Sequence, residues 1–159
     1  MEVRNKVRSV AYDMDVAKIS VLGIPDKPGI AASIFVPLAK AGISVDTIVQ
    51  NSSVNKIADL TFTVTKDQIN EAMKVAKPIA KKLGARDIIA DSELGKVSIV
   101  GTGMQNTPGF AAKMFETLSA NGINIELIST SEIRITCIIK ESKVKEAVRV
   151  LHKAFEVEA

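Results

Sequence analysis

The sequence predicts a mixed α/β (α+β) fold made of two small units, each with an antiparallel sheet. Three observations lead to this prediction. A segment that begins at Ala17 recurs in the segment that begins at Gly95, so the chain contains an internal repeat. Each copy alternates short β-rich runs with amphipathic, helix-like stretches. In addition, 47% of the 159 residues are hydrophobic and 25% are charged, a balance that supports a buried core.

Glycines mark the expected helix ends in both copies. Gly29 corresponds to Gly109 at the start of a helix, where a Pro-Gly pair opens it, and Gly42 corresponds to Gly122 at its end. The first copy is expected to contain strand 18–24, helix 29–41, strands 44–51 and 58–65, helix 67–83 and strand 85–90. The second copy is expected to contain strand 97–102, helix 109–120, strands 125–130 and 133–140, and helix 142–155.

The strand count predicts how the two units are connected. The first copy has the element order βαββαβ of a ferredoxin-like fold, whereas the second copy lacks the last strand. An unassigned strand at 7–12 precedes the first repeat. We expect this N-terminal strand to complete the second sheet, so that the first module is inserted into the second. The expected modules are residues 17–92, and residues 1–16 together with 93–159.

Periodicity predicts which side chains are buried. Helical spacing places four apolar side chains of the first helix against a sheet: Ile30, Ile34, Leu38 and Ala41. Alternation along strand 58–65 separates the apolar side chains, which we expect to be buried, from the polar ones, which we expect to face water: Leu60, Phe62 and Val64 against Asp59, Thr61 and Thr63.

The composition leaves little material for catalysis. The only histidine, His152, lies in the apolar pattern of the last helix, and the only cysteine, Cys137, alternates with isoleucines in a strand. We expect neither side chain to have a chemical role. Gly101 and Gly103 follow a strand, but the third glycine of a dinucleotide-binding loop is missing. We therefore expect no catalytic site and no metal site in this chain.

Charge and hydropathy argue against two classes of partner. The net charge of +3 comes from 21 basic and 18 acidic residues, and only 4% of residues are aromatic, so we expect no nucleic-acid surface. No apolar stretch reaches the roughly 20 residues that cross a bilayer, so we expect no membrane association. A single cysteine is consistent with a reducing, cytoplasmic location.

One turn has the chemistry to bind a small charged molecule. Residues 24–31 (IPDKPGIA) end a strand and begin a helix, whose first backbone N–H groups have no partner within the helix. Gly29 lacks the Cβ that would block close approach, and the helix dipole favours a carboxylate there. Asp26 supplies a negative charge for an ammonium group. The pattern suits an α-amino acid, and it also suits an ordinary turn that starts a helix.

The neighbouring strand and the second copy sharpen this expectation. Strand 44–51 leads into the polar run 50–53 (QNSS), whose amides and hydroxyls can bind a polar side chain. The second copy has Asn106 where the first has Asp26, so it lacks the counter-charge for an ammonium group. We expect one main ligand site, with the second module contributing contacts across an interface.

These residues also carry a resemblance to a known family, the tandem ACT domains that regulate aspartate kinases (aspartokinases). The resemblance runs from about Ser9 to Phe155, nearly the whole chain. In this family the first ACT module is inserted into the second, in agreement with the strand count. Four segments carry the resemblance: LGIPDKPGIAA at 22–32, VQNSS at 49–53, GKVSIVGTGM at 95–104 and NIELISTSEIRI at 124–135.

The resemblance implies allosteric feedback. In this family threonine and/or lysine, end products of the pathway, bind the ACT modules and inhibit the phosphorylation of aspartate that opens lysine, threonine and methionine biosynthesis. The family's effector sites lie where the first module of one chain meets the second module of a partner chain. The implied positions are Asp26, Lys27, Pro28, Gly29, Ile30 and Ala31 around the effector backbone; Gln50 at its side chain; Ser53 and Thr61 near a second amino-acid position; Asn124 and Ile125 closing the site from the partner; and Ser131 and Glu132 near lysine.

The resemblance also implies the partners. We expect a homodimer that forms through the ACT modules and works with a catalytic aspartate kinase subunit or domain. No segment resembles the glycine-rich KFGG-type start of that catalytic domain, so we expect ATP and Mg²⁺ to bind there and no cofactor to bind this chain. The chain is then either a separately made regulatory subunit or a fragment. The alternative function is a dimerisation module that works without a ligand and shows no thermal shift with amino acids.

Overall fold

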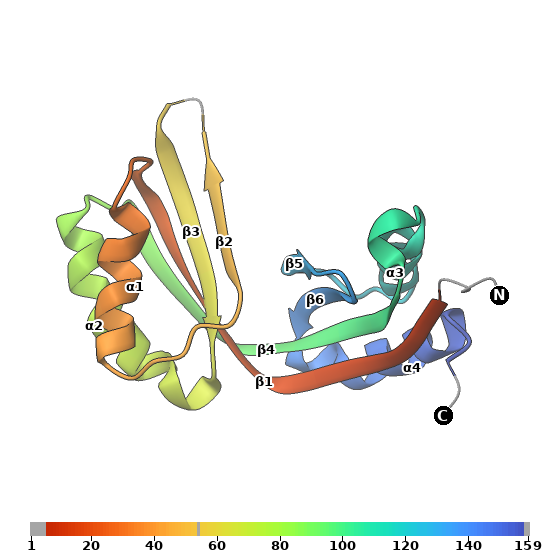
Figure 1. Cartoon of the computed structure of the whole chain (residues 1–159). Helices are drawn as coiled ribbons and strands as arrows, with labels where there is room; N and C mark the ends of the chain where they lie inside the picture. The colour runs from red at the N-terminus through yellow and green to blue at the C-terminus, as the bar shows by residue number, and fades with distance from the viewer. Residues whose placement is uncertain (1–5, 54, 158–159) are drawn as a thin grey trace. The chain divides into compact units, whose positions relative to one another are not determined.

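The computed structural model describes residues 6–53 and 55–157, and the chain divides into two compact units (Figure 1). The first unit comprises residues 15–92, and the second comprises residues 1–14 and 93–159. No helix in the described part of the chain has the length and apolar character needed to span a membrane. In chain order the main elements are β1 (Lys6–Pro25), α1 (Ile30–Lys40), β2 (Ile48–Ser52), β3 (Ile57–Val64), α2 (Ile69–Lys82), β4 (Asp87–Thr102), α3 (Phe110–Ala120), β5 (Leu127–Thr130), β6 (Arg134–Lys140) and α4 (Val144–Ala154).

The same strand order occurs in both units, and the long strands β1 and β4 take part in each. In the first unit the order is β2-β3-β1-β4, and in the second it is β1-β4-β6-β5. The pairs β1–β3, β2–β3, β4–β6 and β5–β6 are antiparallel. Two helices accompany the strands of each unit, as expected for a ferredoxin-like arrangement. The predicted fold class, with two repeated antiparallel modules, is therefore confirmed.

The two long strands were predicted as four separate strands, and this detail is wrong. Strands predicted at 7–12 and 18–24 are one strand, β1, and those predicted at 85–90 and 97–102 are one strand, β4. The segments between the predicted strands contain charged residues, Asp13 and Asp15 in β1 and Asp91 and Glu93 in β4. However, neither stretch contains a proline, and Asp13 is exposed on the extended backbone. A charged side chain that faces solvent leaves the backbone hydrogen bonds of a strand intact, whereas a proline would remove one, so the strand can continue through Asp13.

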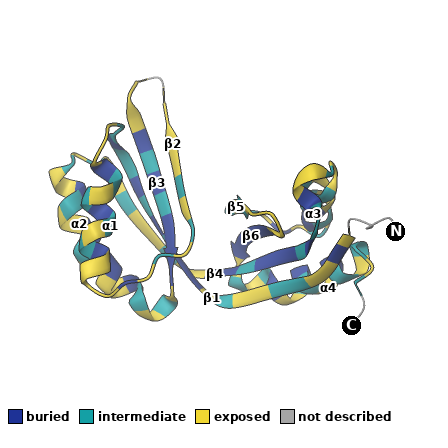
Figure 2. Cartoon of the chain, in the orientation of Figure 1, coloured by how far each residue is buried: buried dark blue, intermediate teal, exposed yellow. Residues whose placement is uncertain are grey.

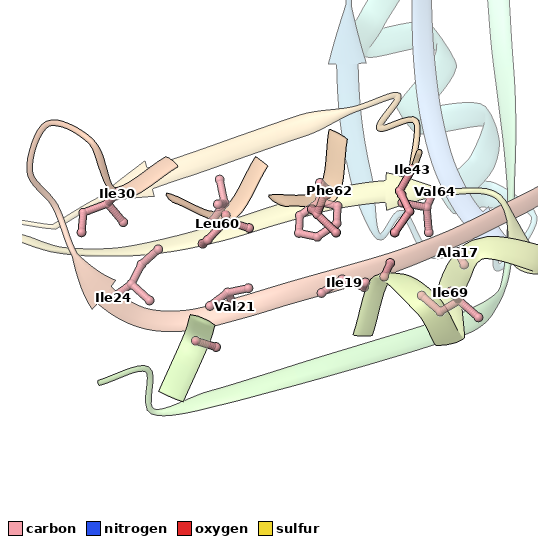
Figure 3. Packing of buried hydrophobic residues seen from close by; sticks show 14 of the residues in the cluster. Ala17, Ile19, Val21, Ile24, Ile30, Ile43, Leu60, Phe62, Val64 and Ile69 are labelled. Carbon is pink, nitrogen blue, oxygen red and sulfur yellow. The ribbon is translucent and has the colours of Figure 1, made fainter. Parts of the chain in front are cut away.

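The core of the first unit lies between the sheet and helices α1 and α2, which cover one face of it (Figures 1 and 3). Phe35 of α1 packs edge to face against Phe62 of β3, with 5.2 Å between the ring centroids. Each helix has a buried side and an exposed side (Figure 2). Ile30, Ile34 and Leu38 are buried as predicted, but Ala41 is exposed because it lies just beyond the last turn of α1.

Strand β3 follows the predicted alternation except at Thr63, which is only 2% exposed. The Thr47 N–H donates to Thr63 Oγ1 at 3.0 Å, and the Thr63 N–H donates to the Thr47 carbonyl oxygen at 3.0 Å. Asp46 N–H also donates to the Thr63 carbonyl oxygen. Asp46 and Thr47 thus both lie opposite Thr63, as in a β-bulge. This irregular pairing explains the burial of Thr63. It also explains why β2 begins at Ile48 rather than at residue 44.

The second unit packs α3 and α4 against β4 and β6, and among its described residues no pair of aromatic rings packs as Phe35 and Phe62 do in the first unit. Cys137 of β6 is fully buried, as predicted, and its thiol lies 4.0 Å from the sulfur of Met114. The C-terminal caps predicted at Gly42 and Gly122 are confirmed by the bonds that follow them. In α1 and α3 alike, the residue directly after this glycine donates its N–H back to a leucine carbonyl oxygen five residues earlier.

Candidate functional site

The turn that opens α1 has free backbone donors at the start of the helix. Gly29 is the N-cap residue, with φ 94° and ψ −13°, and no side chain caps the helix. The Ser33 N–H donates to the Gly29 carbonyl oxygen at 3.0 Å, and this bond begins the helical ladder. Among the described residues, no acceptor is found for the N–H groups of Ala31 and Ala32. These two donors lie at the positive end of the helix dipole and can bind an anion.

The backbone of Asp26 is held in place by the β2–β3 hairpin, which is distant from it in sequence. Its N–H donates to the carbonyl oxygen of Lys56 at 2.8 Å. Lys56 lies between β2 and β3, has the unusual φ of 59°, and donates its own N–H to the Ser53 carbonyl oxygen at 3.2 Å. The Ser53 N–H in turn donates to the Ile57 carbonyl oxygen at 2.9 Å. The Asp26 carboxylate is therefore carried by a backbone that is anchored to the β2–β3 hairpin.

The register of β2 assigns the remaining first-unit residues to opposite faces of the sheet. Gln50 pairs with Leu60, a core residue, so Gln50 belongs to the face that carries α1 and its opening turn. Thr61 belongs to the other face, where its hydroxyl lies 3.0 Å from that of Ser20. The structure thus brings Gln50 to the same face as the turn, and it places Thr61 on the helix-free face.

The turn residues themselves differ in exposure. Lys27, Pro28 and Gly29 are exposed, Asp26 and Ala31 are half-buried, and Ile30 is only 7% exposed because it packs into the core. The exposed residues leave the start of α1 open to a ligand, whereas Ile30 anchors it.

The second-unit candidates lie before β5 and in the β5–β6 turn. Asn124 is exposed, and Ile125 is half-buried against the second core. Ser131 and Glu132 are exposed, and the Ser131 N–H closes the turn by donating to the Arg134 carbonyl oxygen at 2.8 Å. All four candidates therefore belong to the unit that has no Asp26 equivalent.

The turn that opens α3 repeats the geometry without the charge. Gly109 is its N-cap, with φ 105° and ψ −19°, and the Lys113 N–H donates to the Gly109 carbonyl oxygen at 2.9 Å. Asn106 ends a 3₁₀ turn, η2 (Met104–Asn106), and is exposed. This turn therefore offers similar backbone donors and no carboxylate.

Two functional candidates, Asp59 and Arg86, were missed. They line a pocket of about 370 Å³ in the first unit, together with Gly23, Asn51, Ser52, Ser53 and Ile57. Asp59 Oδ1 accepts the Gly23 N–H at 2.9 Å. Asp59 could have been predicted, because the alternation of β3 places it on the solvent-facing side beside the polar run at 50–53. Arg86 could not, because only the folded chain brings it near Asp59.

Cys137 offers no nucleophile. Burial raises the pKa of its thiol from 9.0 to about 12, so the thiol stays protonated at neutral pH. Within the described ranges, no group of three or more His, Cys, Asp or Glu side chains is placed to hold a metal ion. The polar features of the first unit therefore suit binding of a small molecule rather than covalent chemistry.

Comparisons with known proteins bear on the repeat and on the family of the chain. A family model of the ACT domain matches the chain twice, at residues 19–77 and 97–155, and so confirms the internal repeat. The chain is 44% identical over 153 residues to an aspartate kinase of Stutzerimonas stutzeri, covering 96% of this chain and 37% of that protein. It is 42% identical over 160 residues to an aspartokinase of Thermus thermophilus, covering 99% of this chain and 39% of that protein.

Solved structures show the same relationship. The regulatory subunit of aspartate kinase from Thermus thermophilus, in its ligand-free form, has a TM-score of 0.87 and 44% identity, covering 94% of this chain and 98% of that one. A structure of aspartokinase alpha and beta subunits has a TM-score of 0.88 and 42% identity, covering 95% and 99%. The chain spans 37–39% of the length of the two kinases above. It belongs to the ACT domain family, as the tandem regulatory ACT part of aspartate kinases.

Proposed function

We propose that this chain binds an end-product amino acid, threonine and/or lysine, and transmits feedback inhibition to an aspartate kinase. The turn at the start of α1 carries this proposal. It combines the N–H groups of Ala31 and Ala32, which have no acceptor among the described residues, with the carboxylate of Asp26, whose backbone N–H donates to the Lys56 carbonyl oxygen. A carboxylate on the helix N-terminus and an ammonium group on Asp26 satisfy both charges of an α-amino acid. Gln50, on the same face, is available for the side chain of the effector.

The proposed regulation is a shift between arrangements of the modules. A bound amino acid favours one arrangement only to the extent that it binds that arrangement more tightly, and such coupling is typically about 1–3 kcal/mol. In the dimer that we propose, Asn124 and Ile125 of the partner chain close the site over the turn. Ser131 and Glu132 contribute where lysine is the effector. Ser53 and Thr61 lie near a second amino-acid position.

The partner in this proposal is the catalytic part of an aspartate kinase. A related structure contains aspartokinase alpha and beta subunits, and this supports a complex between regulatory and catalytic chains. Phosphorylation of aspartate, with ATP and Mg²⁺, then takes place on the catalytic part. The contribution of this chain is to change, when the effector binds, either the affinity of the catalytic part for its substrates or its turnover.

Calorimetric titration of the Asp26→Asn variant tests the proposal. The substitution keeps the shape of the side chain and the backbone bond to Lys56, and it removes the partner of the ammonium group. We expect the variant to bind threonine or lysine about ten- to a hundredfold more weakly, the range for one charge-assisted hydrogen bond. The matched control is Asn106→Ala in the equivalent turn of the second unit, which we expect to bind as the unaltered chain does.

Two results would contradict the proposal. Unaltered affinity in Asp26→Asn would mean that the ammonium group is bound elsewhere. A folded dimer that gives no binding heat and no thermal shift with either amino acid would favour the ligand-independent dimerisation module.

A further inference from the structure

A pocket of about 300 Å³ lies on the helix-free face of the second unit. The residues on either side of Ser98 in β4, and of Thr136 in β6, belong to the core under α3 and α4, so these two side chains lie on the opposite face. Lys96 and Arg134 come two residues before them in the two strands and share that face. The pocket is lined by Ala11, Tyr12, Asp13, Lys96, Ser98 and Arg134, all of them in the second unit.

Two cationic side chains flank a pair of hydroxyls in this pocket. Ser98 is only 2% exposed, and its hydroxyl oxygen lies 2.6 Å from that of Thr136. Lys96 lies two residues before Ser98 on β4, and Arg134 pairs with Val100, two residues after it. The two cations therefore approach the hydroxyl pair from opposite directions along the strands. This arrangement surrounds a place for a small anion, and the volume suits a small ligand.

Arg134 has free bonding capacity. Its guanidinium group has no hydrogen-bond or ion-pair partner among residues 6–53 and 55–157. Its backbone is fixed, because the Arg134 carbonyl oxygen accepts the Ser131 N–H at 2.8 Å. A planar guanidinium fork on a fixed backbone can bind two oxygens of a phosphate group through parallel hydrogen bonds. Tyr12, which is 60% exposed, can add a hydroxyl donor.

Charge distinguishes this pocket from the equivalent place in the first unit. There Ser20 pairs with Thr61, and Lys18 and Asp59 come two residues before them. The first unit therefore has a carboxylate where the second has the guanidinium group of Arg134. An anion is favoured at this place in the second unit and repelled by Asp59 in the first.

The remaining charges of the pocket leave it positive. Lys96 and Arg134 carry two positive charges against one negative charge on Asp13. Asp13 is exposed, so water screens its repulsion of an anion. Asp13 and Lys96 also take part in other interactions within the protein. Arg134 is therefore the main group available to a ligand.

We propose that this pocket binds a phosphate group, either as the free ion or at the end of a small metabolite. The Arg134 fork holds two of its oxygens, and the Lys96 ammonium group adds the second positive charge. When the Thr136 hydroxyl donates to Ser98, the Ser98 hydroxyl hydrogen is available to a third oxygen. The site is independent of the turn that opens α1, because that turn belongs to the first unit.

Amide chemical shifts of the ¹⁵N-labelled chain test the proposal. We expect inorganic phosphate and glycerol 3-phosphate to cause saturable shifts at Ala11, Ser98 and Arg134, with sodium chloride holding the ionic strength constant. Equal affinities would assign the site to the free ion, and tighter binding of glycerol 3-phosphate would assign it to a phosphate monoester. Arg134→Gln should weaken binding about tenfold or more, and Arg134→Lys should weaken it less, because lysine keeps the charge without the fork.

Two further variants separate specific binding from general attraction of anions. Arg149→Gln removes an exposed arginine from α4 of the same unit and should leave the affinity unchanged. Asp13→Asn removes the negative charge from the pocket and should strengthen phosphate binding about two- to fivefold, the scale of an exposed ion pair. Weaker binding in Asp13→Asn would mean that the pocket takes a zwitterion, and it would overturn the phosphate assignment.

Three other results would also overturn the proposal. The first is the absence of saturable shifts at the pocket amides with both phosphate compounds. The second is binding by Arg134→Gln that is as tight as that of the unaltered chain. The third is equally tight binding of succinate, since it would show that the pocket selects two separated carboxylates rather than one phosphate group.

Discussion

The turns that open α1 and α3 have nearly the same backbone and different charges. Their N-cap glycines differ by only 11° in φ and 6° in ψ (94°, −13° against 105°, −19°). The first helical bonds, made by Ser33 and Lys113, are 3.0 and 2.9 Å long. Yet one turn contains Asp26 and the other contains Asn106. The comparison shows that a Pro-Gly turn sets the geometry of an anion site, while a single side chain decides whether a zwitterion fits it.

The cores of the two units differ in the same way, in chemistry rather than in position. Phe62 pairs with Ile19 and Ile48, and Cys137 occupies the equivalent place opposite Val97 and Ile128. The first unit fills this place with an aromatic ring packed against Phe35, and the second fills it with a thiol beside Met114. The repeat therefore preserves the fold while two different sets of side chains fill the interior.

The largest expected difference between the units is in the cost of truncating these two core side chains. We expect Phe62→Ala to lower the free energy of unfolding by about 3–5 kcal/mol, because it removes a buried ring and leaves a cavity. Cys137→Ala removes one atom from its side chain and should cost about 1 kcal/mol, on the scale of a single buried group. Urea unfolding gives the totals, and amide hydrogen exchange assigns each loss to its unit. Equal losses would show that the two cores are less different than their residues suggest.

The elements of this fold were predictable where local pattern decides them. The helix around Ile34 and the alternation around Phe62 follow from apolar spacing, and the end of α1 follows from Gly42. The continuity of β1 was not predictable, because it depends on pairing with distant strands rather than on the residues at Asp13. Thr63 was misplaced for a related reason, since its burial depends on a bond from Thr47.

A smaller difference is expected between two Ser–Thr pairs on the helix-free faces. Ser98 and Thr136 are both buried, with 2.6 Å between their hydroxyl oxygens, whereas Ser20 and Thr61 are half-buried and 3.0 Å apart. Ser98→Ala should cost about 1–3 kcal/mol because the Thr136 hydroxyl is left buried without a partner. Ser20→Ala should cost about 0.5–1 kcal/mol because water can replace the lost partner. Denaturant unfolding measures both values.

A double variant sharpens this test. Ser98→Ala combined with Thr136→Val removes both hydroxyls, so it should recover much of the stability lost in Ser98→Ala alone. If the double variant is no more stable than the single one, the cost comes from altered packing and the assignment to an unpaired hydroxyl is wrong.

The candidate site was predictable only in its local part. The turn from Asp26 to Ala31 could be recognised because the Pro-Gly pair, the helix start and the carboxylate are adjacent in sequence. The bond from Asp26 to Lys56 could not, because it joins residues from two separate turns. Arg86 was missed for the same reason, since its place beside Asp59 depends on the path of the chain after α2.

The smallest expected effect separates the geometry of the two turns from their chemistry. Gly29→Ala and Gly109→Ala should each cost about 1 kcal/mol, because an alanine is strained at positive φ. A Cβ at either position would meet no atom within 4 Å, so no steric term distinguishes the two variants. Thermal unfolding should therefore shift equally, while calorimetry with threonine or lysine should show weaker binding only for Gly29→Ala. Equal weakening by both variants would mean that the second turn also binds the effector, and that the charge at Asp26 matters less than the backbone donors.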